Sequence, residues 1–259
     1  MFEATDIRVS LNRAEILHGV DFHAAAGAVT AIVGPNGSGK TTLIRALTGD
    51  VRYTGTIRLD GEDVAQMAAW QLAERRGVLP QATRLAFPFT VFEVVRIGLT
   101  SGPNADRIDL VEEALAKVGL HGFEHRFFHE LSGGEQQRAQ LARVLVQVWE
   151  PVSHGRPSWL LLDEPVASLD IAHQLEVMQL ARDYAQAGGG VIAVMHDLNL
   201  TAMFADSIAL LTNGRLARQD VPHRVLEDET LSDAYGCRLR VNTLPDAGTF
   251  LLPHTASAS

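Results

Sequence analysis

The residues best suited to chemistry lie at positions 34–42, which read G-P-N-G-S-G-K-T-T. This order matches G-x-x-x-x-G-K-[ST], in which a glycine-rich backbone turns its N–H groups inward to hold phosphates. Lys40 would place its charge on the β- and γ-phosphates, and the Thr41 hydroxyl would complete the shell of a Mg²⁺ ion. The residues predicted to bind the phosphate chain are Gly34, Pro35, Asn36, Gly37, Ser38, Gly39, Lys40, Thr41 and Thr42.

Two adjacent carboxylates, Asp163 and Glu164, follow the apolar run at 159–162. An aspartate at the edge of a sheet can hold Mg²⁺ through water, and a glutamate beside it can polarise a water molecule aimed at the γ-phosphate. Taken alone, an apolar run that ends in Asp-Glu is a common boundary between a strand and a loop. Its position downstream of a phosphate loop in the same predicted sheet favours a metal role for Asp163 and a catalytic role for Glu164.

A second candidate anion site begins at residues 131–138, which read L-S-G-G-E-Q-Q-R. Ser132 can cap the helix that follows, and Gly133 and Gly134 leave the first N–H groups of that helix uncovered. Uncovered N–H groups at the positive end of a helix attract a negatively charged group. The sequence therefore provides two places where phosphate could bind.

The elements that must position these residues form a strand-rich region up to about residue 81, a helical region at about 90–150, and a region where strands return. The predicted strands occupy 5–10, 20–23, 28–33, 55–61, 159–163, 191–195 and 207–211. A first helix follows the phosphate loop, and amphipathic helices are predicted at 91–98, 110–118 and 134–148. Asn213-Gly214 predicts a tight hairpin turn. Short apolar strands that alternate with helices indicate an α/β fold with a buried parallel sheet.

Composition limits the classes of function. The chain has 259 residues and a formal net charge of −9, which argues against DNA or RNA as a partner because nucleic-acid binding depends on clustered Lys and Arg. No window holds the roughly 18 uninterrupted apolar residues of a membrane span, and the start Met1-Phe2-Glu3 does not fit a signal peptide. Cys237 is the only cysteine, which excludes an internal disulfide and a cysteine-rich zinc site. We expect a cytosolic protein that reaches a membrane only through a protein partner.

With these motifs in this order, nearly the whole chain resembles the nucleotide-binding subunits of ABC transporters. The resemblance implies a P-loop NTPase fold of the ABC type over residues 1–259, with a core formed by 1–86 and 156–259 and a helical subdomain at 87–155. It also implies that 131–136 is the signature sequence, which binds the γ-phosphate of ATP held by the phosphate loop of a partner subunit. Two identical sites would then form across a head-to-tail homodimer.

The resemblance assigns roles to three further residues. Gln81 resembles the Q-loop glutamine, Asp170 belongs to a D-loop that starts at Ser168, and His196 resembles the switch histidine. In isolation each has a simpler reading: a surface amide for Gln81, a helix N-cap for Asp170 and a histidine at a strand end for His196. Their joint order favours the functional roles.

These parts together predict ATP hydrolysis with Mg²⁺, because phosphoryl transfer to water needs positioning and charge neutralisation more than covalent help. The expected catalytic residues are Glu164, His196 and Gln81, and the expected metal ligands are Thr41, Gln81 and Asp163. The signature residues expected to reach the nucleotide from the partner subunit are Ser132, Gly133, Gly134 and Gln136, and Asp170 of the D-loop is also expected to bind the nucleotide. Hydrolysis should therefore require dimerisation. The family often stacks adenine on an aromatic residue upstream of the phosphate loop; none is present here, although Leu11 or Ile16 could pack on the ring.

The remaining question is which transporter the chain serves. Residues 87–95 form an apolar run where the family receives the permease, although this run could instead enter the core of the helical subdomain. Residues 148–151, the extra loop at 150–158 and the segments 171–174 and 195–200 resemble the ATP-binding subunits of haem importers. Importers of iron–siderophores and of cobalamin stay open as alternatives. A non-transport ABC ATPase is disfavoured because the chain has one phosphate loop and no basic stripe.

As a haem importer subunit, the chain would lie peripherally on the cytoplasmic face of the inner membrane. Its expected partners are a second copy of itself, the transmembrane permease subunits and, indirectly, a periplasmic substrate-binding protein. In this family the cargo passes through the permease without touching the ATP-binding subunit. His121, His125 and His129, which recur at intervals of four, are therefore expected to belong to an ordinary connector and not to a haem site.

Overall fold

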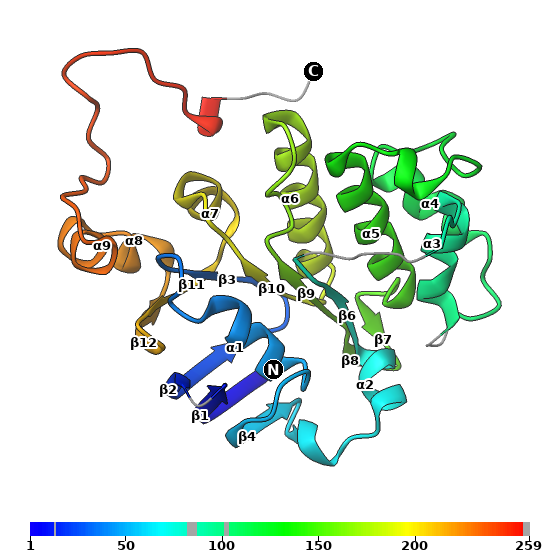
Figure 1. The fold of residues 1–259 in the computed structure, drawn as a ribbon, viewed down its shortest axis with the longest axis horizontal. Coiled ribbons are helices and arrows are strands. Elements are labelled where there is room, and N and C mark those ends of the chain that lie inside the picture. Colours follow the sequence, from blue (N-terminus) through cyan, green and yellow to red (C-terminus); the bar gives the residue numbers. More distant parts are fainter. Residues whose placement is uncertain (13, 82–86, 101–103, 256–259) are drawn as a thin grey trace.

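The computed structural model describes residues 1–12, 14–81, 87–100 and 104–255, which form two main sheets with helices around them (Figure 1). The larger sheet has six strands in the order β12-β11-β3-β10-β9-β6. These strands are β3 (Val29–Val33), β6 (Arg76–Leu79), β9 (Trp159–Asp163), β10 (Gly190–Val194), β11 (Ser207–Thr212) and β12 (Arg215–Asp220). Neighbouring strands pair in parallel, except that β11 and β12 form an antiparallel hairpin.

The smaller sheet is antiparallel, with its strands in the order β2-β1-β4-β5. They are β1 (Phe2–Leu11), β2 (Ala14–Ala24), β4 (Thr54–Leu59) and β5 (Glu62–Asp63). A separate short hairpin pairs β7 (Val152–Ser153) with β8 (Arg156–Pro157). The sequence predicts a strand-rich N-terminal region, but the separate sheet follows from pairings between distant residues, such as Phe2 with Leu59.

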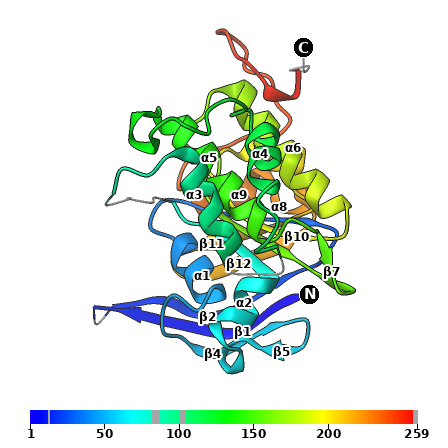
Figure 2. The same ribbon diagram turned by 90° about the vertical axis from the view of Figure 1, so that its right-hand side faces the viewer.

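The helices lie on both faces of the larger sheet. They are α1 (Lys40–Leu47), α2 (Ala69–Arg75), α3 (Val91–Ile97), α4 (Leu110–Lys117), α5 (Gly133–Gln147), α6 (Ile171–Gln186), α7 (Leu198–Phe204), α8 (Pro222–Val225) and α9 (Asp228–Tyr235). Single turns of 3-10 helix occur at Val64–Gln66, Gly98–Thr100, Phe128–Glu130 and Pro253–Thr255. Figures 1 and 2 show α1 close to the antiparallel sheet, whereas α3, α4 and α5 gather away from it.

The two faces of the larger sheet bury different side chains because successive residues of a strand point to opposite sides. On one face, Ile32 and Leu161 pack in one hydrophobic cluster with buried side chains of α1 and of the antiparallel sheet. In that cluster the rings of Phe2 and Trp159 meet edge to face, with centroids 5.2 Å apart. On the opposite face, Leu160 packs in a second hydrophobic cluster with buried side chains of helices α3 to α7. The phosphate loop is therefore anchored at both ends, by the buried strand β3 and by α1 between the two sheets.

Most predicted elements of the α/β fold are confirmed. The predicted strand 159–163 coincides with β9, the prediction 191–195 is shifted by one residue relative to β10, and the prediction 207–211 ends one residue before β11 does. The turn at Asn213-Gly214 is also confirmed, because both residues have a left-handed φ, 47° and 70°, between paired strands. The sequence analysis did not identify α2, β6, β12, α8 or α9.

The boundaries of the two subdomains, 1–86 with 156–259 and 87–155, stay a prediction. Within the ranges that the structure describes, no helix combines the length and the apolar composition needed to cross a membrane.

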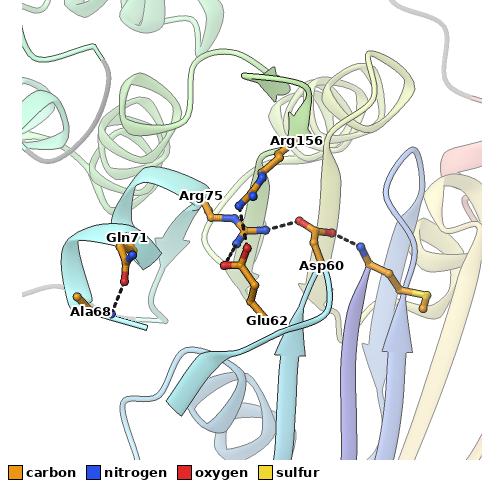
Figure 3. Close-up of polar contacts among 7 residues, drawn as sticks. Asp60, Glu62, Ala68, Gln71, Arg75 and Arg156 are labelled. Carbon is orange, nitrogen blue, oxygen red and sulfur yellow. Dashed lines mark hydrogen bonds and ion pairs between the residues drawn. The ribbon is translucent and has the colours of Figure 1, made fainter. Parts of the chain in front are cut away.

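A network of ion pairs fastens the β7–β8 hairpin to the antiparallel sheet (Figure 3). Arg156 of the hairpin lies with Nη1 2.9 Å from Glu62 Oε1, and Arg75 at the end of α2 binds the same carboxylate at 3.0 Å. Arg75 also binds Asp60 at 2.5 Å, and Asp60 in turn pairs with the amino group of Met1. The side chain of Arg75 is only 11% exposed, so it is the centre of the network. The loop that precedes β9 is therefore an ordered hairpin.

Candidate functional site

The phosphate loop connects β3 to α1 at the carboxyl edge of the larger sheet, where ligands bind in open α/β folds. Gly34 has a φ of 147°, and a Cβ atom there would lie 2.0 Å from the carbonyl oxygen of Leu211. Gly39 has a φ of 102°, and its Cβ would lie 2.8 Å from a methyl carbon of Leu17. Glycine is therefore required at both positions by the close approach of neighbouring strands and by the backbone conformation.

The polar groups of this loop are arranged in a way that fits a phosphate chain. Lys40 Nζ donates hydrogen bonds to the loop carbonyls of Gly34 at 2.8 Å and Pro35 at 3.0 Å, so its charge already lies inside the loop. Burial lowers the pKa of Lys40, while Glu164 and Asp163 act in the opposite direction. Ser38 Oγ is buried and has no hydrogen-bond partner in the described part of the chain. An unpaired buried hydroxyl beside a buried ammonium is suited to an anionic ligand.

Asp163 lies at the end of β9 with only 3% of its surface exposed. Its Oδ1 atom is 3.5 Å from Thr41 Oγ1 at the start of α1. Burial, together with the charge of Glu164, raises the pKa of Asp163 to about 6. A buried carboxylate beside a hydroxyl supplies the hard oxygen ligands that Mg²⁺ prefers, so these two residues fit the predicted metal.

Glu164 and His196 form the pair of side chains nearest to catalytic geometry. His196 Nε2 and Glu164 Oε1 lie 2.7 Å apart, at the ends of the neighbouring strands β10 and β9. Glu164 also has a left-handed backbone with a φ of 56°, a conformation that costs a side-chain-bearing residue on the order of 1–3 kcal/mol. Its N–H donates to the Val194 carbonyl at 3.2 Å, which ties the strained residue to the sheet. Such strain is found most often at functional sites.

Gln81 follows β6 and is exposed. Leu79 of β6 pairs with Leu162 of β9, so Gln81 emerges at the same edge of the sheet as Asp163. No hydrogen bond joins Gln81 to Thr41 or Asp163 within the described residues. The structure thus places Gln81 at the same sheet edge as Asp163, with no hydrogen bond to the predicted metal ligands among the described residues.

Residues 131–136 form the start of α5, where Ser132 is the predicted N-cap. Its Oγ accepts the N–H of Glu135 at 3.3 Å, and Glu135 Oε2 accepts the N–H of Ser132 at 2.7 Å. The Gln136 side chain donates to the Leu131 carbonyl at 3.0 Å, and Ser132 and Gly133 are exposed. Among the hydrogen bonds of the described residues, none joins this segment to the phosphate loop. The structure therefore does not assemble the two predicted anion sites into one within a single chain.

Asp170 is the N-cap of α6, which is the simpler of its two predicted roles. Its side chain is 67% exposed, and Oδ1 accepts the His173 N–H at 3.0 Å and lies 2.8 Å from His173 Nδ1. These contacts lower the pKa of Asp170, the backbone hydrogen bond most of all. A cap leaves the outer side of the carboxylate open, so this role does not compete with a contact to another molecule.

Sequence reasoning missed two glutamines that hold the loop after β9. Gln137 of α5 donates to the Glu164 carbonyl at 3.3 Å. Gln174 of α6 donates to the carbonyls of Val166 at 3.3 Å and Leu169 at 3.0 Å. Gln137 carries no local signal, because its contact joins residues 27 positions apart, whereas Gln174 bonds to the loop that directly precedes its own helix.

The apolar segment 87–95 divides into two parts. Val91, Val94 and Val95 are fully buried on α3, which bears out the core alternative for this half. Phe89 is half-buried against the same core, whereas Phe87 is 71% exposed. Only the entry to the helix is therefore free to meet another protein.

The three recurring histidines, His121, His125 and His129, are exposed. The ring of His129 stacks on Phe127 with centroids 5.6 Å apart. Among the described residues, no group of three or more His, Cys, Asp or Glu side chains is placed to share a metal ion.

Comparisons with known proteins agree with this geometry. Residues 17–167 match the family model described as ABC transporter. The chain is 63% identical over 257 residues to the hemin import ATP-binding protein HmuV of Jannaschia sp. (strain CCS1), covering 99% of this chain and 95% of that protein. It is 60% identical over 256 residues to the protein of the same name from Roseobacter denitrificans (strain ATCC 33942 / OCh 114), covering 98% of each. A solved dimeric bacterial ABC transporter cassette has a TM-score of 0.73 and 25% identity, covering 86% of this chain and 99% of that chain. The chain therefore belongs to the ABC transporter family.

Proposed function

We propose that this chain is the ATP-hydrolysing subunit of an importer that carries haem across the inner membrane. The observation that carries the proposal is the 63% and 60% identity, over nearly the whole chain, to two hemin import ATP-binding proteins. The phosphate loop, the buried carboxylate of Asp163 and the Glu164–His196 pair support ATP hydrolysis as the activity. The cargo is proposed from the relatives, because haem is not expected to touch this subunit.

In the proposed mechanism, the N–H groups of the phosphate loop and the ammonium of Lys40 bind the phosphates of ATP. Lys40 Nζ is held at 2.8 Å and 3.0 Å by carbonyls of its own loop, so it exchanges these partners for phosphate oxygens when the nucleotide binds. Thr41, Asp163 and Gln81 would hold Mg²⁺, which neutralises phosphate charge when it is bound. The low exposure of Lys40 and Asp163 strengthens each of these charge interactions.

Glu164 is proposed as the general base. Its carboxylate would accept a proton from the water molecule that attacks the γ-phosphate. His196 Nε2 lies within hydrogen-bond distance of the same carboxylate, at 2.7 Å, and would orient it. The tethered backbone of Glu164 limits the directions in which the carboxylate can point, which favours catalysis by positioning.

In this proposal a second copy completes the site, contributing Ser132, Gly133, Gly134, Gln136 and Asp170 to the far side of the γ-phosphate. Ser132 Oγ accepts a hydrogen bond within its own cap, so its hydroxyl proton stays available for a phosphate oxygen. The exposed start of α5 and the similar solved cassette, which is described as dimeric, support this arrangement. Hydrolysis would then require dimerisation.

The permease would contact the exposed entry to α3, around Phe87. An aromatic side chain that is 71% exposed next to a buried helix fits a protein interface. The chain would lie on the cytoplasmic face of the membrane and would respond to the periplasmic substrate-binding protein only through the permease.

The test is cargo uptake by sealed vesicles that contain the permease with this chain on the ATP-accessible side. Haem, a ferric siderophore and cobalamin are offered separately, with wild-type chain and with Glu164→Gln. We expect ATP-dependent uptake of haem alone, and its loss with Glu164→Gln. Uptake of a siderophore or cobalamin in place of haem would overturn the cargo assignment. Absence of ATP hydrolysis would overturn the enzymatic assignment as well.

A further inference from the structure

The direction of the Glu164 carboxylate depends on a backbone that the surroundings must hold in place. With a φ of 56°, Glu164 occupies a region that side-chain-bearing residues leave unless other contacts prevent it. Its N–H is fixed by the Val194 carbonyl at 3.2 Å. Its carbonyl accepts two hydrogen bonds, one from the Ala167 N–H and one from Gln137 Nε2, each at 3.3 Å. The side-chain amide of Gln137 is thus the contact to the Glu164 backbone that comes from a separate helix.

Gln137 belongs to the helix that presents the predicted signature residues. It lies in the second turn of α5, five positions after the N-cap Ser132. The first turn of the same helix touches the same loop, because a Cβ at Gly134 would lie 3.0 Å from the Ser168 carbonyl oxygen. A displacement of α5 relative to β9 would therefore act on Glu164 through the Gln137 amide.

We propose that Gln137 is a positioning residue for ATP hydrolysis, whose amide holds the Glu164 carbonyl and thereby ties the direction of the Glu164 carboxylate to the position of α5. The inference rests on the proposed function, in which Glu164 is the general base. Gln137 touches neither nucleotide nor water in this account. It acts through Glu164 alone.

A positioning role and a merely structural role predict different kinetics. If Gln137 only stabilised the fold, its loss would lower the melting temperature and the fraction of active protein. If it positions Glu164, its loss lowers kcat while the KM and Kd for ATP stay unchanged, because the phosphate loop that binds ATP is a separate segment.

The experiment replaces Gln137 with methionine, which keeps the length of the side chain and removes its N–H donor. We expect kcat to fall about three- to tenfold, the effect of one ordinary hydrogen bond, with KM and Kd for ATP within about twofold of wild type. Gln137→Glu keeps the shape but turns a carboxylate oxygen toward the carbonyl, and should lower kcat further. Gln137→Lys restores a donor and should recover most of the turnover.

The matched control is Gln179→Met on the exposed side of α6. The Gln179 amide donates to Asp183 Oδ1 at 2.7 Å within its own helix, and no hydrogen bond of the described residues joins it to the loop after β9. This control removes a glutamine amide from a helix without touching Glu164. Its kcat should equal that of wild type.

Repeating the substitution in the Glu164→Gln variant tests whether Gln137 acts through Glu164. When Glu164 is already glutamine, adding Gln137→Met should cause no further loss of residual turnover, because the two changes act on one group. An equal loss in both backgrounds, or unchanged kcat in Gln137→Met while the wild type hydrolyses ATP normally, would overturn this inference and leave the proposed function intact. Absence of ATP hydrolysis by the wild type would overturn the proposed function and the inference with it.

Discussion

Glu164 combines a left-handed backbone with a carboxylate that is paired to His196 at 2.7 Å. Glu164→Gln keeps the shape of the side chain but removes its ability to accept a proton. We expect turnover to fall by about 10²-fold or more, as for a positioned base, while ATP binding persists. ATPase assays and nucleotide titrations on the purified chain measure the two quantities. Near-wild-type turnover in this variant would remove Glu164 from the role of base.

The burial of Asp163 makes the stability of the metal-free chain depend on pH. Burial and the charge of Glu164 raise its pKa from about 3.8 to about 6. A carboxyl whose pKa is higher in the folded than in the unfolded chain destabilises the folded chain when it ionises. The destabilisation grows as the pH rises from the unfolded pKa to the folded pKa, and it is complete above both pKa values. A rise of this size corresponds to about 3 kcal/mol at pH 8.

Asp163→Asn removes that charge. In chelator and without nucleotide, the variant should have a higher free energy of unfolding than the wild type at pH 8, by up to about 3 kcal/mol. The difference should shrink as the pH falls through 6 and disappear near pH 4, where Asp163 is protonated in the wild type. Denaturant unfolding at several pH values measures it. A constant difference across this range would show that the charge of Asp163 is not the cause.

At the residue scale, the phosphate loop could be predicted because its nine residues are contiguous and their order alone specifies the chemistry. Glu164 and His196 were each predicted to be catalytic, but their contact was not, and the structure places the two side chains 2.7 Å apart. The left-handed backbone of Glu164 and its contact with Gln137 could not be predicted. That contact joins residues 27 positions apart and depends on the packing of α5.

At the scale of elements, β9 and β10 could be predicted because a central parallel strand buries every side chain and reads as an apolar run. Strand β12 lies at the edge of the sheet, and its sequence R-L-A-R-Q-D contains mostly polar residues, so only the predicted hairpin turn before it indicates a strand. Helix α2 buries only Leu72, which is too few apolar residues for a helical period. These elements form because neighbouring elements supply the missing contacts.

At the entry to α3, the exposed Phe87 and the half-buried Phe89 are two positions apart. Phe87→Asp should change the free energy of unfolding by less than about 0.5 kcal/mol, as at other surface positions, and should weaken binding to the permease or uncouple uptake from hydrolysis. Phe89→Asp places a carboxylate against the core and should destabilise the isolated chain by several kcal/mol. Thermal unfolding and co-purification with the permease measure both effects. A stable Phe87→Asp chain that binds the permease and supports normal uptake would exclude this segment from the interface.

At the scale of the whole molecule, the proposed composite site would make two inactive variants complementary. Lys40→Ala should bind ATP about 10- to 150-fold more weakly, because a charge-assisted contact is lost. Ser132→Arg should bind ATP normally but block closure against a second copy. A dimer with one chain of each kind contains one doubly damaged site and one intact site, so mixing the variants should restore measurable ATPase activity. Full activity of Ser132→Arg alone would contradict sites shared between subunits.

A site shared between two copies could be predicted from the family resemblance but not from a local sequence pattern. Its start of α5 is exposed, and within the described residues no hydrogen bond links it to the phosphate loop. In the proposed dimer a second copy would cover the γ-phosphate, and no single sequence element specifies its contacts.

The most direct test of the central claim is the ATPase rate of the chain bound to its permease in vesicles, with the substrate-binding protein supplied on the opposite side. We predict that adding haem raises the rate, that the increase requires Glu164, and that a ferric siderophore or cobalamin leaves the rate at its basal value. A rate that responds to a siderophore or cobalamin and not to haem, or that does not depend on Glu164, would contradict the account.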